Sequence, residues 1–382
     1  MSIWAKTTIG AVLPFRYGKG LPQRMRTHLG KFHVVSSAGV IDQHDEALTH
    51  GSTVVIGRKG SIGTVYYCPD PVFPIDTTFF VEGSDRVDSR FAFYLLSSLP
   101  LSQMNNDSAV PGLNRAQAEN LEILLPPIEE QRSIAATLGS LDDKIESNRR
   151  AIKLVEQLFG MEFQKLLGTE SVDFQPLSRL ISITKGVSYK SADLQPSRTS
   201  LVTLKSFDRN GGYKVDGLKP YVGPYKAQQV VEPGEVVVAQ TDLTQGAEVV
   251  GRAVRVPYDS SADILVASLD LVIVRPSAEI TLEYLLGVLI NESFRDYCRS
   301  RTSGTTVLHL ASDAIPSYMA PIVPASIQQR FSSLSRPLIA RADSLNIEIA
   351  KLASLRDTLL PELLSGRISV PEARDAVQGA VT

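Results

Sequence analysis

Cysteine is nearly absent from this sequence of 382 residues, which contains only Cys68 and Cys298, far apart along the chain. Neither residue belongs to a CxxC pair, and this excludes a zinc ribbon and a disulfide framework. Five histidines are present, and none is paired as HExxH or HxxxH, so we interpret them as ordinary surface or packed side chains. Scarce cysteine is typical of a reducing compartment, and we expect a cytoplasmic protein.

Long apolar runs and catalytic signatures are also missing. No stretch reaches the roughly 18 apolar residues of a membrane span, and the N-terminal segment lacks the apolar core of a signal peptide. The sequence has neither a GxxxxGK[ST] phosphate loop nor a GxSxG elbow. The stretch DPVF at Asp70–Phe73 is similar to the D/N-P-P-Y/F loop of amino-methyltransferases, but Val72 replaces the second proline and no FxGxG loop accompanies it. We therefore predict a non-catalytic chain that has no metal site and no cofactor of its own.

Acidic residues are missing from the first 41 residues, where six lysines and arginines occur. A second basic segment runs from Arg198 to Lys226, where six basic residues face only Asp208 and Asp216. The net charge of the whole chain is only -2, so these are local basic fields, which suit a polyanion. A solvated face that binds nothing remains the alternative interpretation of the charges alone.

The chain does contain a long internal repeat. A segment that ends at Gly168 matches a segment that ends at Gly366, at a constant offset of 198 residues and without a gap. The matched pairs include Pro126 with Pro324, Gln131 with Gln329, Arg132 with Arg330, and Asn148 with Asn346.

Each copy of the repeat carries apolar residues in alternating steps of three and four, which predicts a long helix with a heptad seam. The first helix is expected over Gln131–Leu167, about 55 Å long, with Gly168 and Gly366 as the stops. Two such helices in one chain are expected to pack antiparallel, and a polar seam residue such as Asn148 would fix their register. The predicted seam comprises Leu141, Ile145, Asn148, Ile152, Val155, Phe159, Leu345, Ile349, Leu352 and Leu359.

The segments before the two helices resemble each other as well. Val54–Tyr67 and Val236–Val256 each consist of a β-rich run, a polar loop containing glycine, and a second β-rich run. We predict an α/β (α+β) protein in which two pseudo-repeated, sheet-bearing domains are joined by two long antiparallel coiled-coil helices. The expected boundaries are 1–127 and 171–323 for the domains, 128–170 and 324–370 for the helices, and 371–382 for a frayed tail without a periodic pattern.

The order of the motifs resembles the specificity subunit of a type I DNA restriction–modification enzyme over nearly the whole chain. The matching stretches are GKGLP at Gly18–Pro22, IGRKGSIGTV at Ile56–Val65, LPPIEEQRSIAATLGSLDDKIESN at Leu125–Asn148, GTTVLHL at Gly304–Leu310 and LRDTLLPELLSG at Leu355–Gly366. One departure is Ala325–Gln329 in the second copy, which lacks the acidic EQ form.

This resemblance implies two target-recognition domains that each read one half of a bipartite site on double-stranded DNA. It implies that the helices set the distance between the half-sites and dock two modification subunits, so the seam residues are also candidates for partner docking. S-adenosylmethionine for adenine methylation, and ATP with Mg²⁺ where a motor-nuclease subunit exists, are expected on those partners and not on this chain. The alternative is a non-catalytic coiled-coil adaptor without sequence-specific DNA binding.

Candidate DNA contacts are the basic residues of the two domains, because lysine and arginine neutralise phosphates and arginine also reads bases. The GRKGSIG loop at Gly57–Gly63 allows close backbone approach to a phosphate. A plain turn with exposed cations, or the GXXG loop of a KH domain, is the alternative interpretation. The candidates are Lys19, Arg24, Arg26, Arg58, Lys59, Lys185, Lys190, Lys205, Arg209, Lys214 and Arg252.

Overall fold

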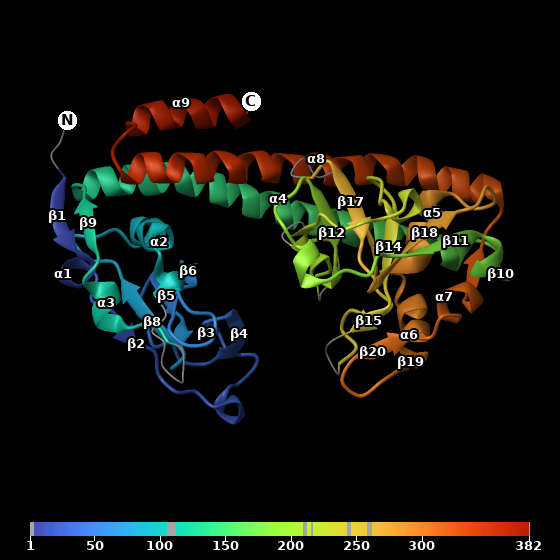
Figure 1. The fold of residues 1–382 in the computed structure, drawn as a ribbon, viewed down its shortest axis with the longest axis horizontal. Coiled ribbons are helices and arrows are strands. Elements are labelled where there is room, and N and C mark those ends of the chain that lie inside the picture. The colour runs from blue at the N-terminus through green and yellow to red at the C-terminus, as the bar shows by residue number, and fades with distance from the viewer. Residues whose placement is uncertain are drawn as a thin grey trace. The chain divides into compact units, whose positions relative to one another are not determined.

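The computed structural model describes residues 4–104, 112–208, 212–214, 217–242, 246–257 and 262–381. The chain divides into two compact units, the first made of Met1–Lys144 with Lys351–Thr382 and the second of Ile145–Ala350. Two long helices, α4 (Ile128–Thr169) and α8 (Ala325–Leu364), each continue from one unit into the other (Figure 1).

Three sheets form the first unit. The four-stranded sheet has the order β2 (Arg16–Tyr17), β8 (Thr78–Glu82), β5 (Thr53–Gly57) and β6 (Val65–Cys68), with every neighbouring pair antiparallel. The three-stranded sheet has the order β4 (Gly39–His44), β3 (Phe32–Ser36) and β7 (Phe73–Pro74), and its β3–β7 pair is parallel. The third sheet pairs β1 (Ala5–Thr8) with β9 (Glu122–Leu125).

The second unit repeats this topology. Its four-stranded sheet has the order β11 (Ile181–Lys185), β18 (Leu271–Pro276), β14 (Val236–Ala239) and β16 (Ala253–Arg255). Its three-stranded sheet has the order β13 (Lys219–Pro220), β12 (Thr199–Val202) and β17 (Ile264–Ala267), again with one parallel pair. β10 (Asp173–Pro176) pairs with β21 (Met319–Ile322), and an additional sheet joins β15 (Thr241–Asp242), β20 (Leu308–Leu310) and β19 (Thr302–Ser303). The predicted fold class, two repeated sheet-bearing domains with two long helices, is confirmed.

The shorter helices follow the same repeat. α2 (Ser89–Ser98) and α5 (Leu282–Ile290) occupy equivalent places, each after the last strand of its unit's four-stranded sheet. Each is capped by a side chain, because Asp88 accepts from the backbone N–H of Phe91 at 2.9 Å and Thr281 accepts from that of Tyr284 at 3.3 Å. The remaining short helices are α1 (Ile9–Val12), α3 (Arg115–Glu119), α6 (Glu292–Ser300) and α7 (Ala314–Ser317).

A buried glutamine ties the start of each long helix to its unit. The side-chain amide of Gln131 donates to the carbonyl of Pro126 at 2.9 Å and accepts from the backbone N–H of Asp88 at 3.0 Å. Gln328 makes the same pair of hydrogen bonds. Its side-chain amide donates to the carbonyl of Val323 at 3.0 Å and accepts from the backbone N–H of Thr281 at 3.2 Å. The counterpart of Gln131 is therefore Gln328, and the sequence pairing of Gln131 with Gln329, like that of Pro126 with Pro324, is wrong by one residue.

Two predictions about helix ends are also wrong. Gly168 does not stop α4, which continues to Thr169, whereas Gly366 has a positive φ of 67° and its N–H bonds to the carbonyl of Leu363 at 3.2 Å. The tail expected to fray forms a helix, α9 (Val370–Val381). Ser369 and Glu372 start this helix as a capping box, in which Glu372 accepts from the backbone N–H of Ser369 at 2.7 Å.

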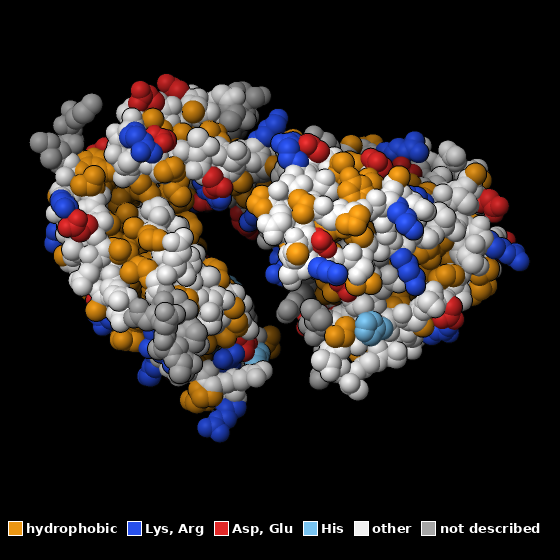
Figure 2. All heavy atoms as spheres, viewed as in Figure 1, with side chains coloured by type: hydrophobic (Ala, Val, Ile, Leu, Met, Phe, Trp, Pro, Cys, Tyr) orange, Lys and Arg blue, Asp and Glu red, His pale blue; other side chains and the backbone are white. Residues whose placement is uncertain are grey.

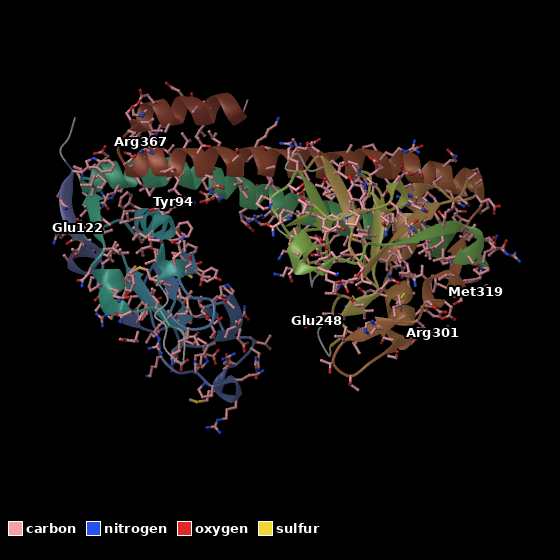
Figure 3. The ribbon with its side chains drawn as sticks, in the orientation of Figure 1. Tyr94, Glu122, Glu248, Arg301, Met319 and Arg367 are labelled. Atoms are coloured by element: carbon pink, nitrogen blue, oxygen red, sulfur yellow. The ribbon has the colours of Figure 1, made fainter. Side chains whose placement is uncertain are left out.

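The long helices run antiparallel, because the first part of α4 and the last part of α8 belong to the first unit while their other parts belong to the second. In the first unit, Asp142 of α4 accepts from Arg356 of α8 at 2.8 Å and from the hydroxyl of Tyr94 at 2.5 Å. Figure 3 labels Tyr94 on α2. In the second unit, Phe163 of α4 lies against Phe331 of α8 and Tyr284 of α5, with ring centroids 5.6 and 5.2 Å away. Within the described parts of the chain, no helix has the length and apolar character needed to span a membrane.

Candidate nucleic-acid interface

The glycine loop predicted from the sequence connects β5 to β6, so strands flank it and the KH alternative is wrong. Gly60 and Gly63 have φ angles of 77° and 72°, in the left-handed region that favours glycine. A Cβ on Gly63 would lie 2.2 Å from the backbone nitrogen of Ser102, so glycine is also required by space. The loop is therefore a fixed turn, and its two basic residues are Arg58 and Lys59.

Arg58 is half-buried and lies against aromatic rings. Its guanidinium carbon is 5.2 Å from the ring centroid of Tyr17 and 5.8 Å from that of Phe79. Tyr17 is 52% exposed, and a second guanidinium, that of Arg115, lies 5.7 Å from its ring. Exposed aromatic rings with stacked arginines are a common element of nucleic-acid surfaces. Arg115 was missed by the sequence reasoning, because only the fold brings α3 next to β2.

The other candidates of the first unit differ in whether their side chains are exposed or already bonded within the protein. Lys19, Arg24 and Lys59 are exposed, as expected for side chains that neutralise phosphates. Arg26 is held by the protein itself, since its Nε donates to the carbonyl of Leu21 at 3.2 Å and its guanidinium lies 3.7 Å from the carboxylate of Asp42.

In the second unit, Lys185, Lys190, Lys205 and Lys214 are exposed, and Arg209 lies outside the described residues. Arg252 is half-buried, and its Nε donates to the carbonyl of Glu248 at 2.6 Å. Burial and the neighbouring Arg295 lower the pKa of Arg252. On the face shown in Figure 2, the lysines and arginines of this unit are spread out, with uncharged surface between them.

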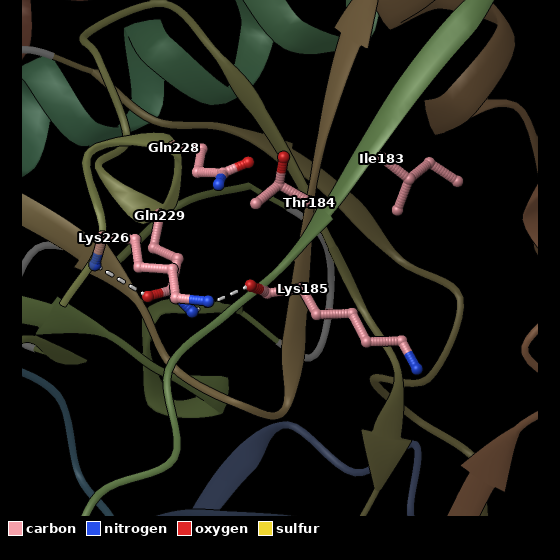
Figure 4. Close-up of a pocket in the computed structure, with 6 residues that line it drawn as sticks. All are labelled: Ile183, Thr184, Lys185, Lys226, Gln228 and Gln229. Carbon is pink, nitrogen blue, oxygen red and sulfur yellow. Dashed lines mark hydrogen bonds between the residues drawn. The ribbon is translucent and has the colours of Figure 1, made fainter.

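A shallow concavity of about 260 Å³ lies beside Lys185 (Figure 4). Gln229 closes one side, because its amide donates to the carbonyl of Lys185 at 3.3 Å and accepts from the backbone N–H of Lys226 at 2.9 Å. The Lys185 side chain extends away from Gln228 and Gln229, so the two glutamines and the lysine do not converge on one point. Lys226 ends the basic segment noted in the sequence but was not among the candidate contacts, and nothing in the local pattern marks the two glutamines.

Most predicted seam residues are buried inside the units. Leu141, Ile145, Asn148, Phe159, Leu345, Leu352 and Leu359 are buried, while Ile152, Val155 and Ile349 are half-buried. The Nδ2 of Asn148 is buried without a hydrogen-bond partner. Buried side chains are not accessible to another protein, whereas other residues of α4 are exposed.

α4 carries an exposed apolar stripe in the second unit, formed by Leu154, Leu158 and Met161, which are 65%, 42% and 68% exposed. The spacing of four and three residues places them on one face of the helix. With the repeat shifted by one residue as Gln328 requires, Leu154 corresponds to Lys351, which is charged and exposed in the first unit. Exposed leucines on one helical face are typical of a protein-binding surface.

Groups that could carry chemistry are not assembled in the described part of the chain. Burial raises the pKa of Cys68 to about 11 and that of Cys298 to about 12, so both thiols stay protonated at neutral pH and are poor nucleophiles. In the part of the chain that the structure describes, no three His, Cys, Asp or Glu side chains lie close enough together to hold a metal ion.

Comparison with known proteins agrees with the resemblance seen in the motifs. Residues 1–157 match the family model described as "Type I restriction modification DNA specificity domain". The chain is 23% identical to the type I restriction enzyme MjaIX specificity subunit of Methanocaldococcus jannaschii, over 84% of this chain and 78% of that protein. It is 30% identical to the EcoprrI specificity subunit of Escherichia coli over 93 residues, which are 24% of this chain and 23% of that protein.

Among solved structures, the S subunit of a type I restriction–modification system from M. genitalium has a TM-score of 0.56 and 18% identity to this chain. The match covers 94% of this chain and 96% of that one. At this identity the likeness shows the fold alone.

Proposed function

We propose that this chain, which is a relative of the specificity subunits of type I restriction–modification enzymes, reads a bipartite DNA site for a multisubunit methyltransferase. The observation that carries the proposal is the repeat of one sheet topology in two units, β2-β8-β5-β6 in the first and β11-β18-β14-β16 in the second. A duplicated unit suits a task performed twice on one duplex. An adaptor would need only the helices.

Within this proposal, residues 1–127 and 171–323 are the two target-recognition domains, and 128–170 and 324–370 are the helices that join them. The α4 helix of 42 residues is about 63 Å long at 1.5 Å per residue, comparable to roughly 18 base pairs at 3.4 Å each. The helices therefore have the length to set the distance between two half-sites. The exposed lysines neutralise phosphates, which gives affinity without sequence preference.

The chain itself is proposed to be non-catalytic, and methyl transfer belongs to modification subunits that dock on it. S-adenosylmethionine would bind those partners. The exposed stripe of Leu154, Leu158 and Met161 offers a docking surface on α4, because burying exposed leucines against a partner removes apolar area from water.

Modular reading of the two half-sites is tested by exchanging Ser171–Pro321 for the same segment of a relative, in cells that contain the methyltransferase partner. We expect one half of the methylated sequence to change and the other half to remain, because the first unit keeps its own recognition residues. Sequencing of N6-methyladenine measures the result. A methylated sequence that the exchange leaves unchanged would favour the adaptor. A change in both halves of the methylated sequence would contradict modular reading.

Docking is tested with the double variant Leu154→Ser, Leu158→Ser. We expect at least a tenfold loss of affinity for the modification subunit with little change in thermal stability, because both leucines are exposed in the isolated chain. Co-purification and binding titration measure the loss. Leu269→Ser is the matched control, since Leu269 is 54% exposed in the same unit but belongs to the turn between β17 and β18 and not to α4. Equal binding by the double variant and the control would exclude the stripe.

A further inference from the structure

Arg58 differs from the other half-buried arginines in the described part of the chain, because its guanidinium has no hydrogen-bond acceptor. The others are engaged, as Arg90 is with Asp143 at 2.6 Å and Arg255 is with Asp343 at 2.6 Å. The Nε of Arg58 is buried and unpartnered, yet the side chain as a whole is half-exposed. A desolvated cation without a partner costs free energy, which a ligand with acceptor atoms would recover.

The geometry around Arg58 is fixed before any ligand binds. Its backbone N–H donates to the carbonyl of Thr77 at 2.9 Å, and its carbonyl accepts from Leu113 at 2.9 Å. The rings of Tyr17 and Phe79 hold the guanidinium. With Nε buried, the two terminal nitrogens are left for a ligand. Such a preorganised fork matches two adjacent acceptors, as on the O6/N7 edge of guanine, at little entropic cost.

Gln240 occupies the equivalent backbone position in the second unit. Its N–H donates to the carbonyl of Asp270 at 2.8 Å, and its carbonyl accepts from Leu310 at 2.8 Å, as Arg58 does with Thr77 and Leu113. The preceding residues agree as well. The backbone N–H of Gly57 donates to the carbonyl of Thr64 at 2.8 Å, and the backbone N–H of Ala239 donates to the carbonyl of Arg252 at 3.0 Å. Gln240 is half-buried, and among the described residues its side-chain amide has no hydrogen bond.

We propose that Arg58 and Gln240 are equivalent base-reading residues, Arg58 for a guanine in one half-site and Gln240 for an adenine in the other. The inference rests on the proposed function and goes beyond it by naming the residues and the bases. Glutamine is the side chain that pairs with the N6/N7 edge of adenine, as arginine pairs with guanine. Gln240 carries no charge, so phosphate neutralisation is not its role. Next to Arg58, the exposed and flexible Lys59 is better suited to a phosphate.

The test uses the full chain with its methyltransferase partner in a host without adenine methylation, and sequencing of N6-methyladenine as the readout. For Arg58→Lys we expect the preference for guanine at one position of the first half-site to fall roughly tenfold to a hundredfold. For Gln240→Ala we expect a similar loss of preference for adenine at one position of the second half-site. Each variant leaves the other half-site unchanged. Lys59→Ala, the control, lowers methylation of all sites without altering the sequence motif.

Two further variants, in which each residue is replaced by the type found at the other position, test the inference even if the first variants lose methylation through misfolding. Arg58→Gln should shift the affected position toward adenine, and Gln240→Arg should shift its position toward guanine. A uniform decrease in methylation with an unaltered motif in Arg58→Lys would make Arg58 a phosphate contact and overturn the assignment. A wild-type motif without guanine in either half-site would overturn it as well. Absence of any methylation by the wild-type complex would instead remove the proposed function, and this inference with it.

Discussion

A seven-residue insertion in both long helices, after Asn148 in α4 and after Asn346 in α8, is expected to reduce methylation of the original site at least a hundredfold. Seven residues are one heptad, so the seam stays in phase and the helices still pair. The insertion lengthens each helix by about 10 Å, which is comparable to three base pairs. Three base pairs also rotate the second half-site by about 100° around the duplex, whereas the heptad turns the helix by only about 20° from two full turns.

A wider gap that matches the longer helices along the duplex therefore mismatches them in rotation about it. Misplacements far smaller than 10 Å already lower the rate of well-aligned reactions by about a hundredfold. Methylation of a series of sites with increasing gaps between the half-sites measures the effect, and residual activity should favour a wider gap. Melting and co-purification with the modification subunit report whether the variant is folded. If the variant methylates the original spacing as well as the wild type does, the helices do not set the distance.

Phe331→Ala is expected to lower the free energy of unfolding of the second unit by about 3–5 kcal/mol, as for other large aromatic-to-alanine changes in cores. Phe331 is 3% exposed, and its ring centroid lies 5.4 Å from that of Phe159 and 5.6 Å from that of Phe163. The change would leave a cavity between α4, α8 and α5 that the surrounding rings fill only in part.

Denaturant unfolding followed by circular dichroism measures this loss. Leu334→Ala, one turn further along α8, is the matched control, because Leu334 is 62% exposed and its truncation is expected to cost less than about 0.5 kcal/mol. Similar costs for the two variants would mean that the aromatic cluster does not hold α8 on the second unit.

The fold class was predictable because its signals are local and periodic. The heptad pattern predicts α4 and α8, and the β-rich runs around Val54 and Val236 predict strands that the structure contains as β5 and β14. The one-residue error in the repeat arose from the doublet Gln328-Gln329, because both alignments place a glutamine opposite Gln131. Only the bonds of Gln328 to Val323 and Thr281 distinguish them.

α9 was missed although its capping box is present in the sequence as Ser369-Val370-Pro371-Glu372. The prediction rested on apolar periodicity, which is weak in this segment, and not on the capping box. Arg58 was a candidate from its sequence, but the aromatic rings and the backbone bond that hold it could not be predicted. These contacts depend on Tyr17, Phe79 and Leu113, which are distant in sequence and meet only in the folded unit.

The division of the chain also has a consequence for synthesis on the ribosome. The second unit is one continuous segment, Ile145–Ala350, whereas the first unit needs both Met1–Lys144 and Lys351–Thr382. The second unit can therefore complete its fold while the nascent chain is still growing. The first unit must wait for its last residues, which take roughly a few seconds at about 5–20 residues per second. A message truncated after Ala350 would yield one finished unit and leave Leu138 and Leu141, buried in the whole protein, without the α8 and α9 segments of their own unit. Such a product is an expected substrate for proteolytic quality control.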